Sequence, residues 1–439
     1  MLTRLDLRGA GRDLRARLPR PAEPGPGPVE AVREIVAAVA ARGDSAVREY
    51  TERFDGVVLD DLRVAPGELL AALDATPAPL REAMETARDA IAWFHRSQVR
   101  VDSRHERDGI VVRELRRPVA RAGLYAPGGR ARYPSTVLMT AVPAREAGVA
   151  ELVLCVPPEG DGRIAGPTLA AAALAGVDEV YRIGGAQAVA AMAYGTETIR
   201  PTDVIVGPGS VYVALAKREV ASSGLVGIPS GFAGPSEVVV VADETTPVEF
   251  AAIDVIVQAE HGPDGLAWLI TWSDEVADAV TEAVTRLVAD SPRRADLEAT
   301  LAGGGYAAIV EGPEQALAVA NVIAPEHLEL MCADAEDLLP LVQNAGAVFC
   351  GLSSPASIGD YLAGPSHVLP TNGSARFSSA LRVDDFVRHV HAVIVDESAL
   401  ARVAPHVVAL AEAEGLDAHA ASVTIRGALA TDARLKAPP

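Results

Sequence analysis

Residues 151–209 read ELVLCVPPEGDGRIAGPTLAAAALAGVDEVYRIGGAQAVAAMAYGTETIRPTDVIVGPG, and they indicate the fold class. Short apolar runs lie at 151–156, 179–183 and 203–206. Ala-rich stretches with helical character separate them, beginning at Gly166 and Gly185. Strands that are apolar throughout and alternate with helices are typical of a parallel sheet with both faces covered. The stretch therefore predicts an α/β unit around such a sheet.

The same alternation restarts after a Gly- and Pro-rich break at about 225–237. We predict strands at 237–242, 266–271, 306–310 and 347–350 and helices at 247–261, 274–289 and 313–324. The chain is therefore expected to have an α/β fold with two tandem Rossmann-like parallel-sheet domains.

Both ends of the chain depart from this pattern. Arginines and a Pro/Gly-rich run near the start predict a helical N-terminal arm. Residues 29–54 and 66–99 have the periodicity of long amphipathic helices. The Ala-rich end predicts a helical C-terminal tail, with a weak strand signal only at 390–395. The expected organisation is an arm of 1–28, a discontinuous α/β domain of 29–122 plus 238–380, a second α/β domain of 123–237, and a tail of 381–439.

The composition excludes several classes of protein. Hydrophobic residues make up 49% of the 439 residues, enough for a sizeable core. A formal net charge of −20 disfavours nucleic acid and anionic membranes as partners. No apolar run reaches about 18 residues, so no membrane span is expected. The cysteines form no CxxC pair and the start lacks a signal-peptide pattern, which predicts a cytoplasmic protein.

Two polar clusters stand at predicted helix ends. Gln258 and His261 are three residues apart, so they share one face of a helix and can ligate a divalent metal or orient a substrate. A histidine at a helix end can equally satisfy a last-turn carbonyl. Glu326 and His327 place two bases side by side, suited to proton transfer and water activation, although they also fit a capping pair.

Two further pairs lie towards the C-terminus. Asp360 and His367 follow the predicted strand at 347–350, and loops at the carboxyl ends of strands often carry the sites of α/β proteins. Ordinary turn chemistry is the alternative. Glu414 and His419 are five residues apart in the tail, where a solvated helix end is the plainer interpretation.

Glycine loops suit the binding of an anion at a helix N-terminus. Gly207-Pro208-Gly209 follows a strand and opens a helix, but Tyr212 replaces the third glycine of the dinucleotide fingerprint. No acidic ribose partner follows a matching strand. Gly184-Gly185 also joins a strand to a helix. Cys155 could be a nucleophile, but its apolar strand favours a buried thiol.

Taken together, the motifs resemble those of the histidinol dehydrogenase family over nearly the whole chain. The matching stretches, in order, are Gly123-Leu124-Tyr125-Ala126-Pro127-Gly128-Gly129, Gly184-Gly185-Ala186-Gln187-Ala188, Ala233-Gly234-Pro235-Ser236-Glu237, Asp254 to Asp264, Pro325-Glu326-His327-Leu328, Gly359-Asp360-Tyr361, His367-Val368-Leu369-Pro370-Thr371 and Ala418-His419. So many separated matches are far from chance.

The resemblance implies a four-electron oxidation of L-histidinol to L-histidine with NAD and one zinc ion per subunit. It implies the zinc ligands Gln258, His261, Asp360 and His419. The substrate-contacting positions that it implies are Ser236, Gln258, His261, His327, Asp360, His367, Glu414 and His419. The nucleotide-contacting positions are Tyr125, Gln187 and Ser210.

The resemblance also implies roles and an assembly. His327 takes the hydroxyl proton in both oxidations, and Glu326 activates the water that adds to the bound aldehyde. Family members are homodimers whose tails cross over, so Glu414 and His419 would complete the partner's site. This chain departs from the family at Ser210, where an asparagine is usual, and at Pro229-Ser230, where Ile-Asp is usual. These departures bear on cofactor affinity and on substrate fit.

Other functions fit parts of the pattern. A paralogue that oxidises another small alcohol with NAD would share most of these residues. A zinc hydrolase would use the zinc, the glutamate and the histidine, but not the strand–glycine–helix units. A non-enzymatic two-domain binding protein would have no need for Glu326 beside His327.

Overall fold

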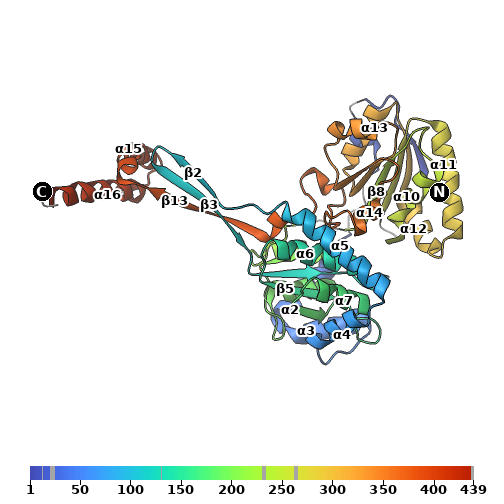
Figure 1. The fold of residues 1–439 in the computed structure, drawn as a ribbon, viewed down its shortest axis with the longest axis horizontal. Coiled ribbons are helices and arrows are strands. Elements are labelled where there is room, and N and C mark those ends of the chain that lie inside the picture. The colour runs from blue at the N-terminus through green and yellow to red at the C-terminus, as the bar shows by residue number, and fades with distance from the viewer. Residues whose placement is uncertain (12, 20–24, 130, 230–233, 262–264, 437–439) are drawn as a thin grey trace. The chain divides into compact units, whose positions relative to one another are not determined.

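The computed structural model describes residues 1–11, 13–19, 25–129, 131–229, 234–261 and 265–436 (Figure 1). The chain forms two compact units. The first holds residues 1–99 and 119–386, and the second holds residues 100–118 and 387–439. Two parallel sheets lie in the first unit and an antiparallel sheet in the second, so the predicted α/β fold with two parallel sheets is confirmed.

The smaller parallel sheet has the order β6-β5-β4-β7. Its strands are β4 (Arg121–Tyr125), β5 (Glu151–Val156), β6 (Glu179–Arg182) and β7 (Val204–Val206). The strands are almost entirely buried, which explains why they are apolar throughout. The chain order reverses between β4 and β7, and α/β sheets bind ligands outside the strand ends at such a point.

Helices cover both faces of this sheet (Figure 1). One face packs against α4 (Pro66–Asp74), α5 (Ala78–Arg96), α6 (Pro134–Glu146) and α7 (Gly166–Leu174). The other packs against α2 (Pro26–Arg42), α3 (Asp44–Asp55), α8 (Gly185–Tyr194) and α9 (Val211–Ala221).

Two helices predicted as continuous are each divided in two. The helix predicted over 29–54 is α2 and α3, because Gly43 takes a φ of +54°, which few other residues adopt easily. The helix predicted over 66–99 is α4 and α5. Pro77 separates them, since a proline disfavours helical backbone in the residue before it.

The larger parallel sheet has the order β1-β10-β9-β8-β11-β12. Its strands are β1 (Thr3–Asp6), β8 (Glu237–Val241), β9 (Leu266–Thr271), β10 (Gly305–Ile309), β11 (His327–Leu330) and β12 (Ala347–Cys350). One face is covered by α10 (Val248–Val257), α11 (Asp274–Asp290) and α12 (Arg294–Gly304). The other is covered by α1 (Leu14–Arg17) and α13 (Pro313–Ile323) (Figure 1).

Two strands of this sheet were not predicted. The expected helical arm is wrong for Thr3–Asp6, which pairs in parallel with β10 and places Leu2 and Leu7 in the two cores that flank the sheet. The second is β11, which lies between β8 and β12 in the sheet and follows α13 in the chain. Two of its four residues, His327 and Glu329, are polar although buried, so the strand lacks the apolar run by which the others were predicted.

The second unit is a three-stranded antiparallel sheet followed by two helices. The sheet has the order β13-β3-β2, from β2 (Ser103–Arg107), β3 (Ile110–Pro118) and β13 (Val387–Val395). Helices α15 (Glu397–Ala413) and α16 (Asp417–Lys436) complete it. The tail was expected to be helical apart from a weak strand signal at 390–395; that signal marks a real strand, which begins earlier, at Val387, and pairs along the whole of β3. No helix in the described ranges is long and apolar enough to cross a membrane.

Candidate active site

Four of the predicted catalytic and metal-binding residues, Gln258, Glu326, His327 and Asp360, meet at the amino edge of the larger sheet. Strands β8 and β11 begin there, with Glu237 and His327. A helix that follows a parallel strand runs back along the sheet, so α10 ends at the same edge beside Gln258. Helix α14 (Ala356–Tyr361) does the same and brings Asp360 back to His327. The predicted loop at a carboxyl edge is therefore wrong for Asp360, which lies in a helix.

His327 is buried and held through one ring nitrogen. Its Nδ1 lies 3.0 Å from the backbone oxygen of Glu237 and must donate to it, since a carbonyl only accepts. Its Nε2 lies 3.5 Å from Oδ1 of Asp360 and makes no hydrogen bond to any described residue. The ring also stacks on Phe349 with centroids 5.9 Å apart. The imidazole is thus fixed with Nε2 as its reactive atom.

Glu326 is anchored to the backbone of the same residue, Glu237. Its Oε2 accepts a hydrogen bond of 2.8 Å from the backbone nitrogen of Glu237 and lies 3.5 Å from Nδ1 of His327. The backbone of Glu237 therefore holds both side chains, one through its N–H and the other through its C=O. Two neighbouring bases are fixed relative to each other in a water-poor site.

Burial and mutual charge shift the pKa values of this group. Burial raises the pKa of Glu326 to about 7, although His327 opposes the shift. Burial also raises the pKa of Glu237 to about 8, with a further contribution from Glu326. Burial would lower the pKa of His327, but the carboxylates of Glu326 and Asp360 outweigh it and raise that pKa to about 9. Groups that exchange protons near neutral pH suit acid–base catalysis.

Gln258 and Asp360 are in direct contact. Nε2 of Gln258 donates a hydrogen bond of 3.0 Å to Oδ2 of Asp360. Burial would raise the pKa of Asp360, but its electrostatic interaction with His327 and the hydrogen bond from Gln258 outweigh it and the pKa is lowered. This carboxylate is therefore ionised and available to a cation.

The helix predicted over 247–261 does not continue to His261, so Gln258 and His261 do not lie in one α-helix. Helix α10 ends at Val257, Gln258 is its C-cap, and His261 closes a short 3₁₀ helix, η1 (Ala259–His261). The side chain of His261 lies outside the described part of the chain. Among the side chains that are described, no group of three or more His, Cys, Asp or Glu is arranged to hold a metal.

His367 joins the two halves of the first unit at this site. Its Nδ1 donates to the backbone oxygen of Asp360 at 2.9 Å, and its Nε2 lies 3.1 Å from Oγ1 of Thr136 on α6. Ser236 directly precedes β8 and is partly buried. Its loop neighbour Ser230 lies outside the described residues. Thr136 was missed because a threonine inside an apolar helix carries no signal in a single sequence.

Glu414 and His419 belong to the second unit. Glu414 caps the end of α15 and His419 lies in the first turn of α16, and both side chains are exposed. Within their own unit they are free to contact another molecule.

The predicted nucleotide-contacting residues lie in the smaller sheet's half. Tyr125 ends β4 at the switch point, and its Oη accepts a hydrogen bond of 3.1 Å from the nitrogen of Gly185 at the start of α8. Gln187 is buried in the first turn of α8, while Ser210 is exposed at the start of α9. Cys155 is fully buried and burial raises its pKa to about 12, so it is no nucleophile.

Three buried acids in or against the larger sheet were not predicted from the sequence. Glu237 begins a strand of valines, and Glu329 lies at the centre of β11, where its Oε1 accepts from the first backbone nitrogen of α14. Asp254 on α10 contacts Glu329. The available signal was a carboxylate inside an otherwise apolar strand, because such groups are rarely buried without a role.

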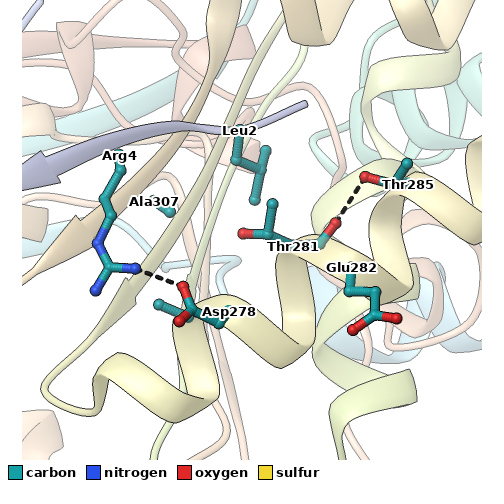
Figure 2. A pocket seen from close by; sticks show the side chains of 8 residues that line it. Leu2, Arg4, Asp278, Thr281, Glu282, Thr285 and Ala307 are labelled. Carbon is teal, nitrogen blue, oxygen red and sulfur yellow. Dashed lines mark hydrogen bonds and ion pairs between the residues drawn. The ribbon is translucent and has the colours of Figure 1, made fainter.

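A surface pocket of about 280 Å³ lies away from these residues, between β1 and α11 (Figure 2). Arg4 and Asp278 form an ion pair at its edge, and Thr281 and Thr285 line its wall. None of the predicted site residues lines it.

Fold and site together define a class: an α/β enzyme of two parallel sheets with a buried acid–base pair beside a carboxylate–carboxamide pair. The family model described as Histidinol dehydrogenase matches residues 20–427. The histidinol dehydrogenase of Parasynechococcus marenigrum is 49% identical over 393 residues, 89% of each chain. That of Moorella thermoacetica is 48% identical over 398 residues, 90% of this chain and 93% of the other.

A solved structure agrees. The crystal structure of histidinol dehydrogenase from Elizabethkingia anophelis matches with a TM-score of 0.90 at 34% identity, covering 97% of this chain and 98% of that one. The chain belongs to the histidinol dehydrogenase family and is an oxidoreductase, which confirms the resemblance seen in its motifs.

Proposed function

We propose that this protein oxidises L-histidinol to L-histidine, the last steps of histidine biosynthesis, using NAD and one zinc ion per subunit. The observation that carries the proposal is the placement of Glu326 and His327, both fixed by the backbone of Glu237, next to Asp360 and Gln258. Membership of the family supplies the substrate, because its named relatives are histidinol dehydrogenases.

The donor set fits zinc. Gln258 and Asp360 are close enough to bind one ion once the amide of Gln258 turns its oxygen towards Asp360. His261 follows three residues after Gln258, and His419 of a tail would supply the fourth ligand. When bound, zinc would hold the amine and imidazole of the substrate, and NAD would accept a hydride in each oxidation.

The two bases then have separate tasks. Nε2 of His327 takes the proton of the substrate hydroxyl as the carbinol carbon is oxidised, because Nδ1 is committed to Glu237. Glu326 removes a proton from the water that adds to the aldehyde, and His327 acts again in the second oxidation. Asp360 stabilises protonated His327, so engagement of Asp360 by a cation would favour the neutral imidazole that this role needs.

Other residues would bind rather than react. Ser236, His367 and Glu414 contact the substrate in this proposal. Tyr125, Gln187 and Ser210 contact the nucleotide at the end of β4 and at the starts of α8 and α9. The short side chain of Ser210 leaves this contact weaker than an asparagine would.

We also propose a homodimer with shared active sites. In the second unit, the only buried side chains among those described are Ala399 and Ala411. Its exposed apolar side chains include Val101, Val390, Val393, Ile394, Val395, Leu410, Leu416 and Ile425. A unit with so little core of its own needs a partner surface, and a second copy would also give Glu414 and His419 a site.

The test of the reaction is the amount of NADH formed per L-histidinol consumed, with and without a zinc chelator. The proposal expects two NADH per substrate, abolished by the chelator and restored by zinc. No NADH from histidinol, in protein that still binds zinc and NAD, would indicate a paralogue that oxidises another alcohol. Turnover of an ester or amide without NAD would indicate a hydrolase instead.

A further inference from the structure

A partly buried carboxylate that the reaction above does not use, Asp55, lies at the end of α3. Oδ2 of Asp55 is enclosed and has no hydrogen-bond partner in the described part of the chain. Burial raises the pKa of Asp55 to about 6. A carboxylate at the negative end of a helix dipole is unfavourable as well. Folding gains little from this group, and unfavourable polar groups of that kind concentrate at binding sites.

The packing of α3 directs Asp55 towards the start of α8. At the other end of α3, the backbone nitrogen of Asp44 donates a 2.7 Å hydrogen bond to Glu197, just beyond the end of α8. The two helices pack against each other, and the Asp55 end of α3 acts electrostatically on Tyr125, which bonds the start of α8, so they run antiparallel. Asp55 therefore lies at the level of Gly185, where its charge acts on Tyr125.

Gln187 supplies a second polar atom without a partner at the same place. Its side chain is 1% exposed, and its Oε1 makes no hydrogen bond to any described residue. This oxygen folds back over Gly185, since a Cβ built on Gly185 would lie only 2.7 Å from it. Oη of Tyr125 meets the nitrogen of Gly185 from the sheet side. Two oxygens thus flank the first residue of α8, and the charge of Asp55 acts on one of them, Oη of Tyr125.

The chemistry of these oxygens selects the ligand. A carboxylate and an amide oxygen accept hydrogen bonds, so they need donors and repel a phosphate. A dinucleotide offers donors of this kind in the hydroxyl pairs of its riboses. We propose that Asp55, with Gln187 beside it, accepts hydrogen bonds from a ribose hydroxyl pair of the nucleotide. This inference rests on the proposed use of NAD.

The structure thereby supplies an acid that the sequence pattern lacks. In dinucleotide-binding folds the ribose partner usually follows a strand of the same sheet, and no such acid was found here. Asp55 comes instead from α3, before the first strand of the smaller sheet in the chain. If the adenosine ribose is the one bound, a 2′-phosphate would lie against the carboxylate, so NAD would be preferred over NADP.

The test compares Asp55→Asn with a matched control, Asp74→Asn. Asp74 is also the last residue of a helix, α4, but it is exposed. We expect Asp55→Asn to weaken NADH binding about tenfold to a hundredfold, as loss of a charge-assisted hydrogen bond would, with Asp74→Asn unchanged. Fluorescence titration of the full-length zinc-loaded protein measures this. Asp55→Asn should unfold at no lower temperature than the wild type, which a purely structural role would not predict.

Binding measurements with smaller nucleotides identify which ribose is bound and can overturn the proposal. ADP carries only the adenosine ribose, and reduced nicotinamide mononucleotide carries only the nicotinamide ribose. Asp55→Asn should therefore weaken the binding of one of these two nucleotides and not of the other. The deoxy form of that nucleotide should bind the wild type more weakly but lose nothing further in Asp55→Asn. Equal deoxy losses in both proteins, or unchanged NADH binding in Asp55→Asn, would overturn this inference and leave the NAD proposal intact. A wild type that binds no NADH would overturn both.

Discussion

At the scale of single residues, the site anchors two bases that are neighbours in the chain through different backbone atoms. Glu326 is held by the backbone N–H of Glu237 and His327 by its C=O, so each keeps its place when the other is changed. A glutamine at position 326 can still accept the hydrogen bond from that N–H, and an asparagine at 327 can still donate to that C=O. The two substitutions therefore remove proton transfer while leaving the anchors.

Glu326→Gln should block the second oxidation more than the first, because water addition needs its carboxylate. In a single turnover with excess NAD, we expect about one NADH per site at near-normal rate and a second about a hundredfold to ten-thousandfold slower. His327→Asn should slow both NADH phases by a similar factor. Bound zinc and NADH affinity serve as controls and should not change. Equal slowing of both phases by Glu326→Gln would contradict the assignment.

At the scale of elements, helix α9 contains a lysine with an unusual environment. Lys217 is buried, and its Nζ donates to the backbone oxygen of Gly207 in the loop after β7. Only glycine fits at position 207, because its φ is +110° and a Cβ would collide with the backbone of Tyr125. The lysine thus supports the turn that faces the proposed nucleotide site.

The lysine predicts a pH dependence of stability. Burial lowers the pKa of Lys217 from its ordinary 10.5 to about 7, so between these values the unfolded chain binds the extra proton and stability rises with pH. Lys217→Met should lose this slope. Urea unfolding from about pH 7.5 to about pH 9 should show the wild type gaining about 2 kcal/mol relative to the variant. Parallel pH profiles of the two proteins would mean that Lys217 is not buried as a neutral amine.

The same scale shows what the sequence could predict. Apolar runs such as 151–156 and 266–271 predicted their strands correctly, because strands buried on both faces must be apolar. Strand β11 was hidden because His327 and Glu329 are half of it, and β1 because it is short and charged. The type of each catalytic residue was visible in the motifs. Their meeting at the amino edge was not, because it depends on where α10 and α14 end.

Some contacts could not be predicted because they join distant segments through the backbone. Glu237 acts through its peptide, so its side chain gave no hint of the role. The charge of Asp55 acts on Tyr125 because α3 packs on α8, and neither residue's type predicts that packing. Residues that act by position rather than by type leave little trace in a single sequence.

At the scale of the whole molecule, the proposed dimer places essential residues on different chains. A His419→Ala chain keeps its own bases but has a damaged tail. A Glu326→Gln chain has a damaged base but an intact tail. Each alone should be nearly inactive. A mixed dimer would hold one intact site, built from the core of the first chain and the tail of the second. Because half of randomly formed dimers are mixed, co-expression should restore about a quarter of wild-type activity.

The control for this rescue pairs two chains damaged in the same part. Co-expressed Glu326→Gln and His327→Asn chains both lack a working base, so no arrangement of tails can restore a site. If Glu414 and His419 instead served their own chain, the His419→Ala mixture would also stay inactive. Rescue in that mixture alone would therefore show that the exposed ends of α15 and α16 act in trans. That result would also explain why the second unit has almost no core, because its apolar surface would be buried only in the dimer.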